Sequence, residues 1–200
     1  MKAPTQFQAS GLSHEHSALL LTEAINYSLY ILQLPIFCLY LDARSAFDRL
    51  VREILMRRMF LDGTADHALV YFDQRLTNRK TIIEWDKELL SPIHDEQGVE
   101  QGGIKSGELY KLYNNEQLQI SQLSNLGVNI GNIHVAAIGQ ADDVVLLSND
   151  MYSLSNLLSL TMLYCSKYHV KLSHEKTQLQ VYAPPKLQQS AQYFHCTNSY

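Results

Sequence analysis

Apolar and polar positions follow two different periods along this chain, and these periods predict its helices and strands. Apolar residues recur every three or four positions in residues 14–33, 46–60, 65–76, 104–123 and 151–169, which is typical of helices. Short apolar runs rich in strand-forming residues occupy 36–42, 128–139, 144–148 and 177–183, and residues 80–85 and 88–94 have the pattern of a hairpin. We therefore predict an α+β fold, with an antiparallel βαββαβ-type sheet and helices on one face.

Composition limits the class of protein. The chain has 200 residues, of which 46% are hydrophobic and 18% charged, enough for one large domain or a domain with an appendage. No apolar run approaches the roughly 20 residues of a membrane span, and the N-terminus lacks the apolar core of a secretory signal. The three cysteines are an odd number without CxxC spacing. They predict reduced thiols in an intracellular protein, and no signal distinguishes nucleus from cytoplasm.

The charge is unevenly distributed. The net charge of −4 argues against a freestanding nucleic-acid binder, because neutralising phosphates requires lysine and arginine. Residues 44–80 nevertheless contain all seven arginines, and they carry eight basic against five acidic side chains. A solvated helix face and a surface for an acidic partner both explain this segment.

A doubled carboxylate interrupts the apolar stretch HVAAIGQADDVVLLSND, at Asp142 and Asp143. The flanking strands place QADD at a hairpin turn, and aspartates at a solvated turn need no further function. Asp42 changes this picture, because it ends the strand predicted at 36–42 and that strand can neighbour the hairpin in the sheet. Three carboxylates at one sheet edge suit hard divalent cations such as Mg²⁺, and two such ions can support in-line phosphoryl transfer.

Four segments of the chain carry a family resemblance. LDARSAFDRL, GVEQGGIKSG and GQADDVVLL have the order and approximate spacing of reverse-transcriptase motifs A, B and C, and KYHVKLSHEKTQLQVYAP is similar to motif D. FQASGLSHEHSALLLTEAI is similar to the fingers segment that precedes motif A. The chain thus resembles the fingers and palm of a non-LTR (LINE-type) retrotransposon reverse transcriptase, with residues 1–184 as partial fingers and palm and 185–200 as a polar tail.

The resemblance implies an RNA-directed DNA polymerase that uses an RNA template, a DNA primer, dNTPs and two Mg²⁺ ions, for which Mn²⁺ can substitute. Phe47 would select deoxynucleotides, because its ring leaves room for a 2′-hydrogen but not for a 2′-hydroxyl. The alternative for Phe47 is plain core packing. For Gln101 and Gly102 of motif B the alternative is an ordinary Gly-rich turn, and for Lys176 it is a solvated surface side chain. The resemblance also implies that Asp42 and Asp142 bind the metal ions, with Asp143 beside them and the Ala43 carbonyl completing the ligand set. Lys176 would donate a proton to the leaving pyrophosphate. The dNTP pocket would include Gln101, Gly102 and Arg44.

The sequence also departs from the family pattern. Gln140 replaces an aromatic residue before ADD, Gly107 replaces a proline after the motif B serine, and Gln8 and Leu12 stand where basic residues are common. Arg44 could partly substitute for those basic residues. No helical thumb follows motif D, so we expect a piece of a longer element or a truncated copy. Two alternatives stay open: a catalytically silent remnant that only binds nucleic acid or a partner, and a small binding module of unrelated descent.

Overall fold

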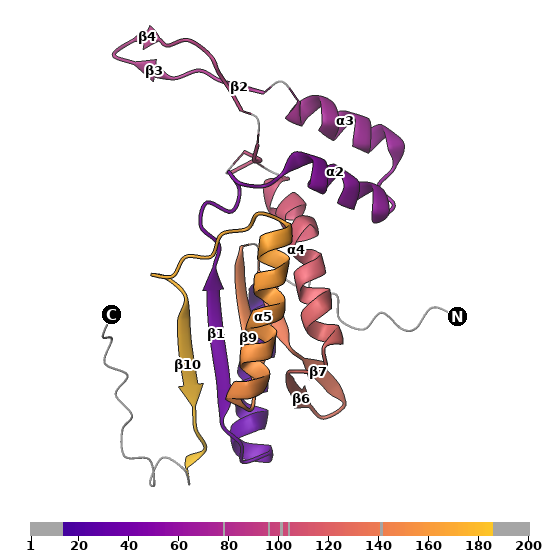
Figure 1. Cartoon of the computed structure of the whole chain (residues 1–200), viewed down its shortest axis with the longest axis vertical. Coiled ribbons are helices and arrows are strands. Elements are labelled where there is room, and N and C mark those ends of the chain that lie inside the picture. The colour runs from indigo at the N-terminus through magenta and orange to yellow at the C-terminus, as the bar shows by residue number, and fades with distance from the viewer. Residues whose placement is uncertain are drawn as a thin grey trace.

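The computed structural model describes residues 14–77, 79–95, 97–100, 102–103, 105–140 and 142–185. An antiparallel sheet forms one end of the molecule, and two short helices with a protruding hairpin form the other (Figure 1). The sheet has the strand order β10-β1-β9-β8, with β10 at Gln178–Tyr182, β1 at Ile36–Asp42, β9 at Asp143–Ser148 and β8 at Ala137–Gln140.

The two central strands explain why the sheet forms. β1 has the bounds predicted from its apolar run, and it pairs with β9 on one side and β10 on the other. In β9, residues 144–148 are all buried. Because successive side chains point to opposite faces, this continuous burial requires cover on both faces of the sheet.

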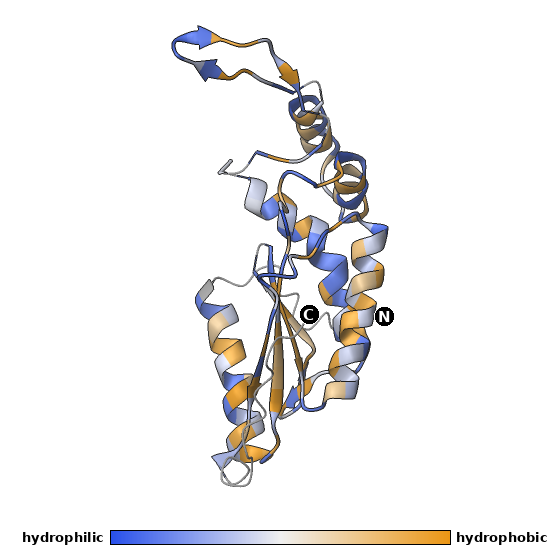
Figure 2. Ribbon diagram, turned by 60° about the vertical axis from the view of Figure 1, so that its left-hand side comes forward, coloured by the Kyte–Doolittle hydropathy of each residue, from blue (hydrophilic) through white to orange (hydrophobic). Residues whose placement is uncertain are grey.

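Helices provide that cover on both faces, as Figure 2 shows. On one face α4 (Ser106–Leu123) packs on β8 and α5 (Met151–Lys167) packs on β9. This agrees with the prediction of helices on one face of the sheet. The opposite face is covered by α1 (His14–Asn26). The sequence predicted a helix here, over 14–33, but placed helices on one face only. The physical reason is that Cys38 and Leu147 on this second face are fully buried apolar residues, which would otherwise lie in water.

A separate core joins the remaining helices to the sheet. Here α2 (Arg52–Leu61) and α3 (Asp66–Leu76) pack against the start of α4 and the end of α5. The predicted helix over 46–60 begins only at Arg52, so its first part was wrong. The carbonyls of Phe47 and Leu50 accept hydrogen bonds from the N–H groups of Val99 and Gly98, at 2.9 and 2.8 Å. These carbonyls therefore bind a loop that is distant in sequence, and not the N–H groups of a helix.

A two-stranded arm projects from this second core (Figure 1). The predicted hairpin is present, but its pairing is broken into β2 (Lys80–Thr81) with β5 (Ile93–His94) and β3 (Glu84–Trp85) with β4 (Glu88–Leu89). Asp86 and Lys87 both have positive φ, which suits the tight turn of a twisted hairpin. All four short strands are exposed, so the arm has no core of its own.

Two other predicted elements are present but are divided in the structure. The π-helical turn η2 (Tyr27–Ile31) extends α1 before Pro35 ends it, and the predicted strand over 128–139 divides into β6 (Val128–Ile130), β7 (Ile133–Val135) and β8. Among the described helices, none is long and apolar enough to cross a membrane. The division at residue 184 stays a prediction, because residues 186–200 lie outside the described part of the chain.

Two of the three cysteines lie in the described residues, and both are buried free thiols. Burial raises the pKa of Cys38 to about 12 and that of Cys165 to about 11. Thiols with such pKa values stay protonated at neutral pH, so they behave as core residues and not as nucleophiles or metal ligands.

Candidate active site

Three aspartates meet where the two central strands end. Asp42 is the last residue of β1, and it lies directly opposite Asp143, the first residue of β9. The β8–β9 ladder pairs Gln140 with Asp143, so Asp142 lies in the turn between these strands. The sequence prediction that Asp42 and QADD come together across neighbouring strands is therefore correct.

The proximity of these carboxylates has an electrostatic consequence. The pKa of Asp143 is raised, first by partial burial and then by the negative charges of Asp142 and Asp42. Lys176 opposes this shift. Its Nζ lies 3.3 Å from Oδ1 of Asp42, although 71% of the Lys176 side chain is exposed. The sheet edge therefore concentrates negative charge that a cation can relieve.

Backbone hydrogen bonds hold the segment around Lys176 beside the end of β1. The N–H of Ser173 donates to the carbonyl of Asp42 at 2.8 Å, and the N–H of Arg44 donates to the carbonyl of Lys171 at 2.7 Å. Between these bonds, Ala43 and Leu172 form an antiparallel bridge. The motif D segment thus continues the sheet past Asp42, and this continuation brings Lys176 to the carboxylates.

The donor set matches the chemistry of a divalent cation. Carboxylate oxygens are hard ligands, and Mg²⁺ is usually held by one or two carboxylates together with waters and substrate phosphates. Within the described residues, no group of three or more His, Cys, Asp or Glu side chains encloses a metal position on its own. Among the described residues, the aspartates therefore do not form a closed structural metal site.

Phe47 lies in the turn that connects β1 to α2. Its ring packs against Tyr110 of α4, with ring centroids 5.2 Å apart, and its side chain is half-buried. Burial and the charge of Asp142 together raise the pKa of Tyr110. Phe47 therefore belongs to the second core, and it also lies close to the carboxylate edge.

The Gly-rich loop at 98–103 approaches this turn closely. Gly98 has φ +78°, and a Cβ there would lie 2.8 Å from the carbonyl oxygens of Phe47 and Asp48. Gly102 has φ +85° and is exposed, which favours glycine for its backbone conformation alone. Gln101 lies outside the described residues. The loop is thus fitted to the turn that carries Phe47.

Arg52 is the residue that sequence reasoning missed. It is only 9% exposed, and its guanidinium donates to the carbonyls of Asp95, Gln97 and Gly98. The seven arginines were interpreted as a group, yet Arg52 shares the buried face of α2 with Leu55 and Met59. An arginine at a helical core position was the available signal, because a buried guanidinium needs hydrogen-bond partners.

Two further predicted residues have different surroundings. Arg44 is exposed, and it lines a shallow hollow with His169 and Lys171. Its backbone is tied to the motif D segment, whereas its contact with a triphosphate stays a prediction. Gln140, which replaces an aromatic residue, has its Oε1 3.4 Å from the hydroxyl of Ser17 on α1, beside Asp143.

The sheet, its helices and the carboxylate edge together have the architecture of a polymerase palm. Residues 5–194 match the model of the reverse transcriptase (RNA-dependent DNA polymerase) family. Because this match covers nearly the whole chain, the chain belongs to that family.

Similar proteins agree with this assignment. Residues of this chain are 23% identical over 141 positions to the Transposon TX1 uncharacterized 149 kDa protein of Xenopus laevis, which covers 70% of this chain and 11% of that protein. The predicted likeness to a non-LTR retrotransposon reverse transcriptase is confirmed by the family match and this transposon relative.

Solved structures show the same fold. The apo telomerase of Candida tropicalis, truncated from its C-terminal domain, has a TM-score of 0.65 at 14% identity, and the match covers 86% of this chain and 35% of that one. Telomerase of Candida albicans in complex with the TWJ fragment of telomeric RNA has a TM-score of 0.54 at 12% identity, over 88% and 33% of the two chains. The chain therefore spans about a third of these structures and about a tenth of its transposon relative.

Proposed function

We propose that this chain is the catalytic core of an RNA-directed DNA polymerase that extends a DNA primer on an RNA template. The observation that carries the proposal is the pairing of Asp42 with Asp143 across the central strands, with Asp142 in the adjoining turn. Family membership supports the polymerase over a catalytically silent remnant or an unrelated binding module.

The reaction is nucleotidyl transfer. The primer 3′-hydroxyl loses its proton to water, and its oxygen forms a bond to the α-phosphorus of a dNTP. The bond from that phosphorus to the oxygen bridging the α- and β-phosphates breaks, and pyrophosphate leaves. Two Mg²⁺ ions, or Mn²⁺ in their place, would supply charge stabilisation for the attacking and leaving oxygens. Asp42 and Asp142 would hold the ions, with Asp143 beside them and the Ala43 carbonyl as a further ligand.

Lys176 has a role on the leaving side of this reaction. Its ammonium group already lies against Asp42, on an exposed segment that backbone bonds tie to β1. A lysine held there can give a proton to the departing pyrophosphate, whose negative charge rises as it leaves. Its ion pair with Asp42 is exposed on the lysine side and is therefore weak enough to be exchanged for a phosphate contact.

The nucleotide pocket would lie between the β1–α2 turn and the Gly-rich loop. Phe47 would face the sugar and exclude a 2′-hydroxyl, Gln101 and Gly102 would line the base and template side, and Arg44 would contact the triphosphate. The contacts that support this pocket are the Gly98 approach to Phe47 and the fixation of the loop by Arg52.

The test is primer extension on a primed RNA template with dNTPs and Mg²⁺, at low salt and high protein concentration. Asp142→Asn keeps the shape of the turn but removes a metal-binding charge. Loss of that charge should raise the activation free energy of extension by several kcal/mol, so the rate of extension should fall about a thousandfold. Asp62→Asn, an exposed change at the end of α2, is the matched control and should keep full activity. Equal activity of wild type and Asp142→Asn would contradict the proposal.

A further inference from the structure

Cations gather on a face that the proposed reaction does not use, where α2 meets the C-terminal end of α5 (Figure 1). A hollow of about 350 Å³ lies there, and it is lined by residues of α2, α4 and α5 and by Tyr168, which follows α5. The charged residues that line this α2–α5 hollow are Arg57, Arg58, Lys167 and Glu116. In a chain whose net charge is −4, the hollow is a local excess of positive charge.

The positive charge continues beyond the α2–α5 hollow. Tyr168 also lines the shallow hollow beside the motif D segment. The basic residues that line this second hollow are Arg44, Arg49, His169 and Lys171. Among the described residues that line the two hollows, Glu116 is the only carboxylate. The two hollows thus form one cationic surface, which attracts an acidic partner.

Glu116 shows which ligand group these cations accept. Its carboxylate pairs with the guanidinium of Arg58, accepts a hydrogen bond from the hydroxyl of Tyr168, and lies 3.4 Å from Nζ of Lys167. Only 20% of the Glu116 side chain is exposed, whereas 65% of the Lys167 side chain is exposed. Arg57 is exposed as well. One carboxylate does not balance three cations, so the exposed cations can take further carboxylates from a ligand.

Apolar side chains border the same cations. Ile54 and Leu61 lie two turns apart on α2, and both line the hollow. Leu61 is 65% exposed. On α5, Leu163 lies one turn before Lys167, on the same side of that helix, and it is 69% exposed. The surface therefore fits a ligand that carries both acidic and apolar groups.

Among the described residues that line the α2–α5 hollow, Tyr168 is the only aromatic one, and its ring is not open to a nucleobase. Tyr168 is 7% exposed, and the charged groups of Arg58 and Lys167 lie 5.3 and 4.9 Å from the centre of its ring. Single-stranded nucleic acids gain much of their binding from stacking on exposed rings. Phosphates also leave exposed leucine side chains in water, whereas an amphipathic peptide covers them. These features favour a protein ligand over a nucleic acid.

The terminal segments of this chain lack the charge that such a ligand needs. Residues 1–13 and 186–200 contain no aspartate or glutamate. We propose that the α2–α5 hollow binds a segment of a partner protein that carries aspartates or glutamates beside leucine-like side chains. The carboxylates of the partner pair with Arg57 and Lys167, and its apolar side chains pack on Leu61 and Leu163. The inference goes beyond the polymerase function and does not depend on it.

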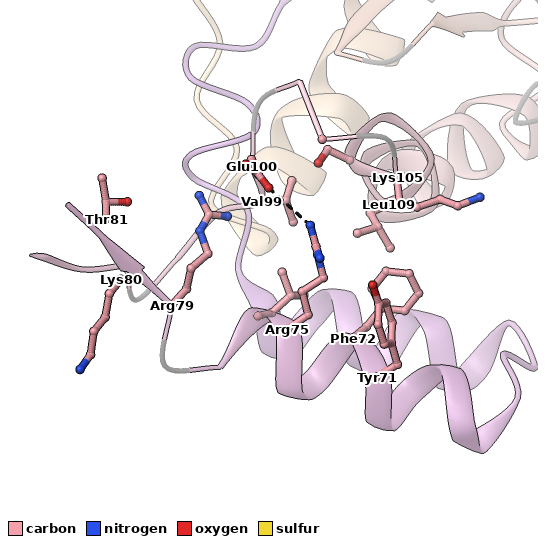
Figure 3. Close-up of a pocket in the computed structure, with 13 residues that line it drawn as sticks. Tyr71, Phe72, Arg75, Arg79, Lys80, Thr81, Val99, Glu100, Lys105 and Leu109 are labelled. Atoms are coloured by element: carbon pink, nitrogen blue, oxygen red, sulfur yellow. Dashed lines mark ion pairs between the residues drawn. The ribbon is translucent and has the colours of Figure 1, made fainter. Parts of the chain in front are cut away.

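A second cationic site provides a control for this proposal. It is a cleft of about 660 Å³ between α3, β2 and the loop that leads into α4 (Figure 3). Its cations come from three segments: Arg75 from α3, Arg79 and Lys80 from around the start of β2, and Lys105 from the residue before α4. This cleft borders the Gly-rich loop and shares no lining residue with the α2–α5 hollow. Its cations therefore allow the same change of charge at a separate place.

Fluorescence anisotropy with the full chain tests the proposal in the absence of nucleotide and Mg²⁺. The probe is a labelled helical peptide with glutamates along one side and leucines beside them, and a second peptide has glutamines in place of the glutamates. The acidic peptide should bind, more weakly as salt is raised, and the glutamine peptide should bind about tenfold more weakly. Arg57→Gln/Lys167→Gln should bind the acidic peptide about tenfold more weakly than wild type, because two charge pairs are lost.

Matched variants separate the hollow from general effects. Arg75→Gln/Lys105→Gln removes the same charge from the cleft in Figure 3 and should bind the acidic peptide as wild type does. Leu61→Ser should bind it about fivefold more weakly because apolar contact is lost, whereas Leu123→Ser, at a leucine that is 80% exposed at the end of α4, should not. Equal losses in the control variants, equal binding of the glutamine peptide, or no binding of the acidic peptide would overturn the proposal.

Single-stranded RNA tests the alternative occupant of this surface. Its affinity is measured for wild type, Arg57→Gln/Lys167→Gln and Leu61→Ser. If the hollow binds a protein segment, all three should bind RNA alike. An RNA affinity that falls about tenfold in Arg57→Gln/Lys167→Gln, with Leu61→Ser unchanged on both RNA and peptide, would assign the surface to nucleic acid and overturn the proposal.

Discussion

The sheet and the arm contain the same kinds of residue in opposite surroundings. Leu146 in β9 is fully buried between helices, whereas Leu89 in β4 is 71% exposed and Trp85 in β3 is 74% exposed. In β1 and β9 both faces are covered, so a slip of one residue would move buried side chains to the wrong face. The arm has no covered face, and its pairing is limited to two short ladders. Burial, and not strand-forming composition, therefore fixes register in this molecule.

The largest predicted effect compares the two regions directly. Leu146→Ala should lower the free energy of unfolding by about 2–5 kcal/mol, because it leaves a cavity in a closed core. Leu89→Ala removes the same atoms from the exposed arm and should change it by less than about 0.5 kcal/mol. Urea denaturation of both variants measures the difference. Similar losses of unfolding free energy in the two variants would mean that the side chains of the arm are buried in solution.

The second prediction concerns the joint between the two regions. Arg52→Ala should cost about 2–4 kcal/mol, because three backbone carbonyls at 95, 97 and 98 lose a charged donor. Arg57→Ala, an exposed arginine on the same helix, should be almost neutral. Thermal denaturation is the measurement. If Arg52→Ala and Arg57→Ala unfolded at the same temperature, the stability of the loop would not depend on the Arg52 guanidinium.

The third prediction is a stabilisation at the same joint. Gly107 lies in the first turn of α4, and a Cβ there would meet nothing within 4 Å. Gly107→Ala should therefore raise the free energy of unfolding by about 0.5–1 kcal/mol, since alanine loses less backbone entropy in a helix. Gly98→Ala is a control that should instead lower the free energy of unfolding, because its Cβ would collide with the backbone of Asp48. A destabilised Gly107→Ala protein would contradict this account of the helix start.

The smallest effect should appear at the open end of the sheet and depend on pH. The pKa of Asp143 is raised from its ordinary value of 3.8, so the ionised carboxylate opposes folding above the raised pKa. This opposition disappears as pH falls through the raised pKa toward 3.8. Asp143→Asn should therefore melt slightly above wild type at pH 7, with a difference that shrinks toward pH 4.

Mg²⁺ provides a control for the pH experiment that does not involve catalysis. An ion on the aspartates would relieve the same repulsion, so Mg²⁺ should stabilise wild type more than Asp143→Asn. A melting difference that is constant across pH, or a Mg²⁺ effect equal in both proteins, would show that carboxylate repulsion is not its source.

Local pattern was sufficient where intrinsic propensity and apolar period favour the same element. The strand at 36–42 was predicted with its observed bounds, and the helices predicted at 65–76 and 151–169 appear as Asp66–Leu76 and Met151–Lys167. The turn at QADD also follows from local signals, because strands on either side leave only a short connection. In each case propensity and apolar period favour the same structure.

Local pattern failed where a distant segment takes over a backbone group. The residues before Arg52 have helical spacing, yet the carbonyls of Phe47 and Leu50 bind the loop at 98–99. The predicted 128–139 strand similarly divides, with a Gly131 of positive φ between β6 and β7. The Asp42–Lys176 contact depends on a bridge between Ala43 and Leu172, which no spacing along the chain could reveal.

The sequence by itself determined the polymerase motifs, the identity of the three aspartates and most of the helices and strands, because these depend on residue types and local periods. Only the tertiary structure decided that α1 covers the second face, that Arg52 is buried under the Gly-rich loop, and that cations from three segments line one cleft. Each of these arrangements joins groups far apart in the chain. Their free energy comes from long-range burial and hydrogen bonding, which a local pattern does not contain.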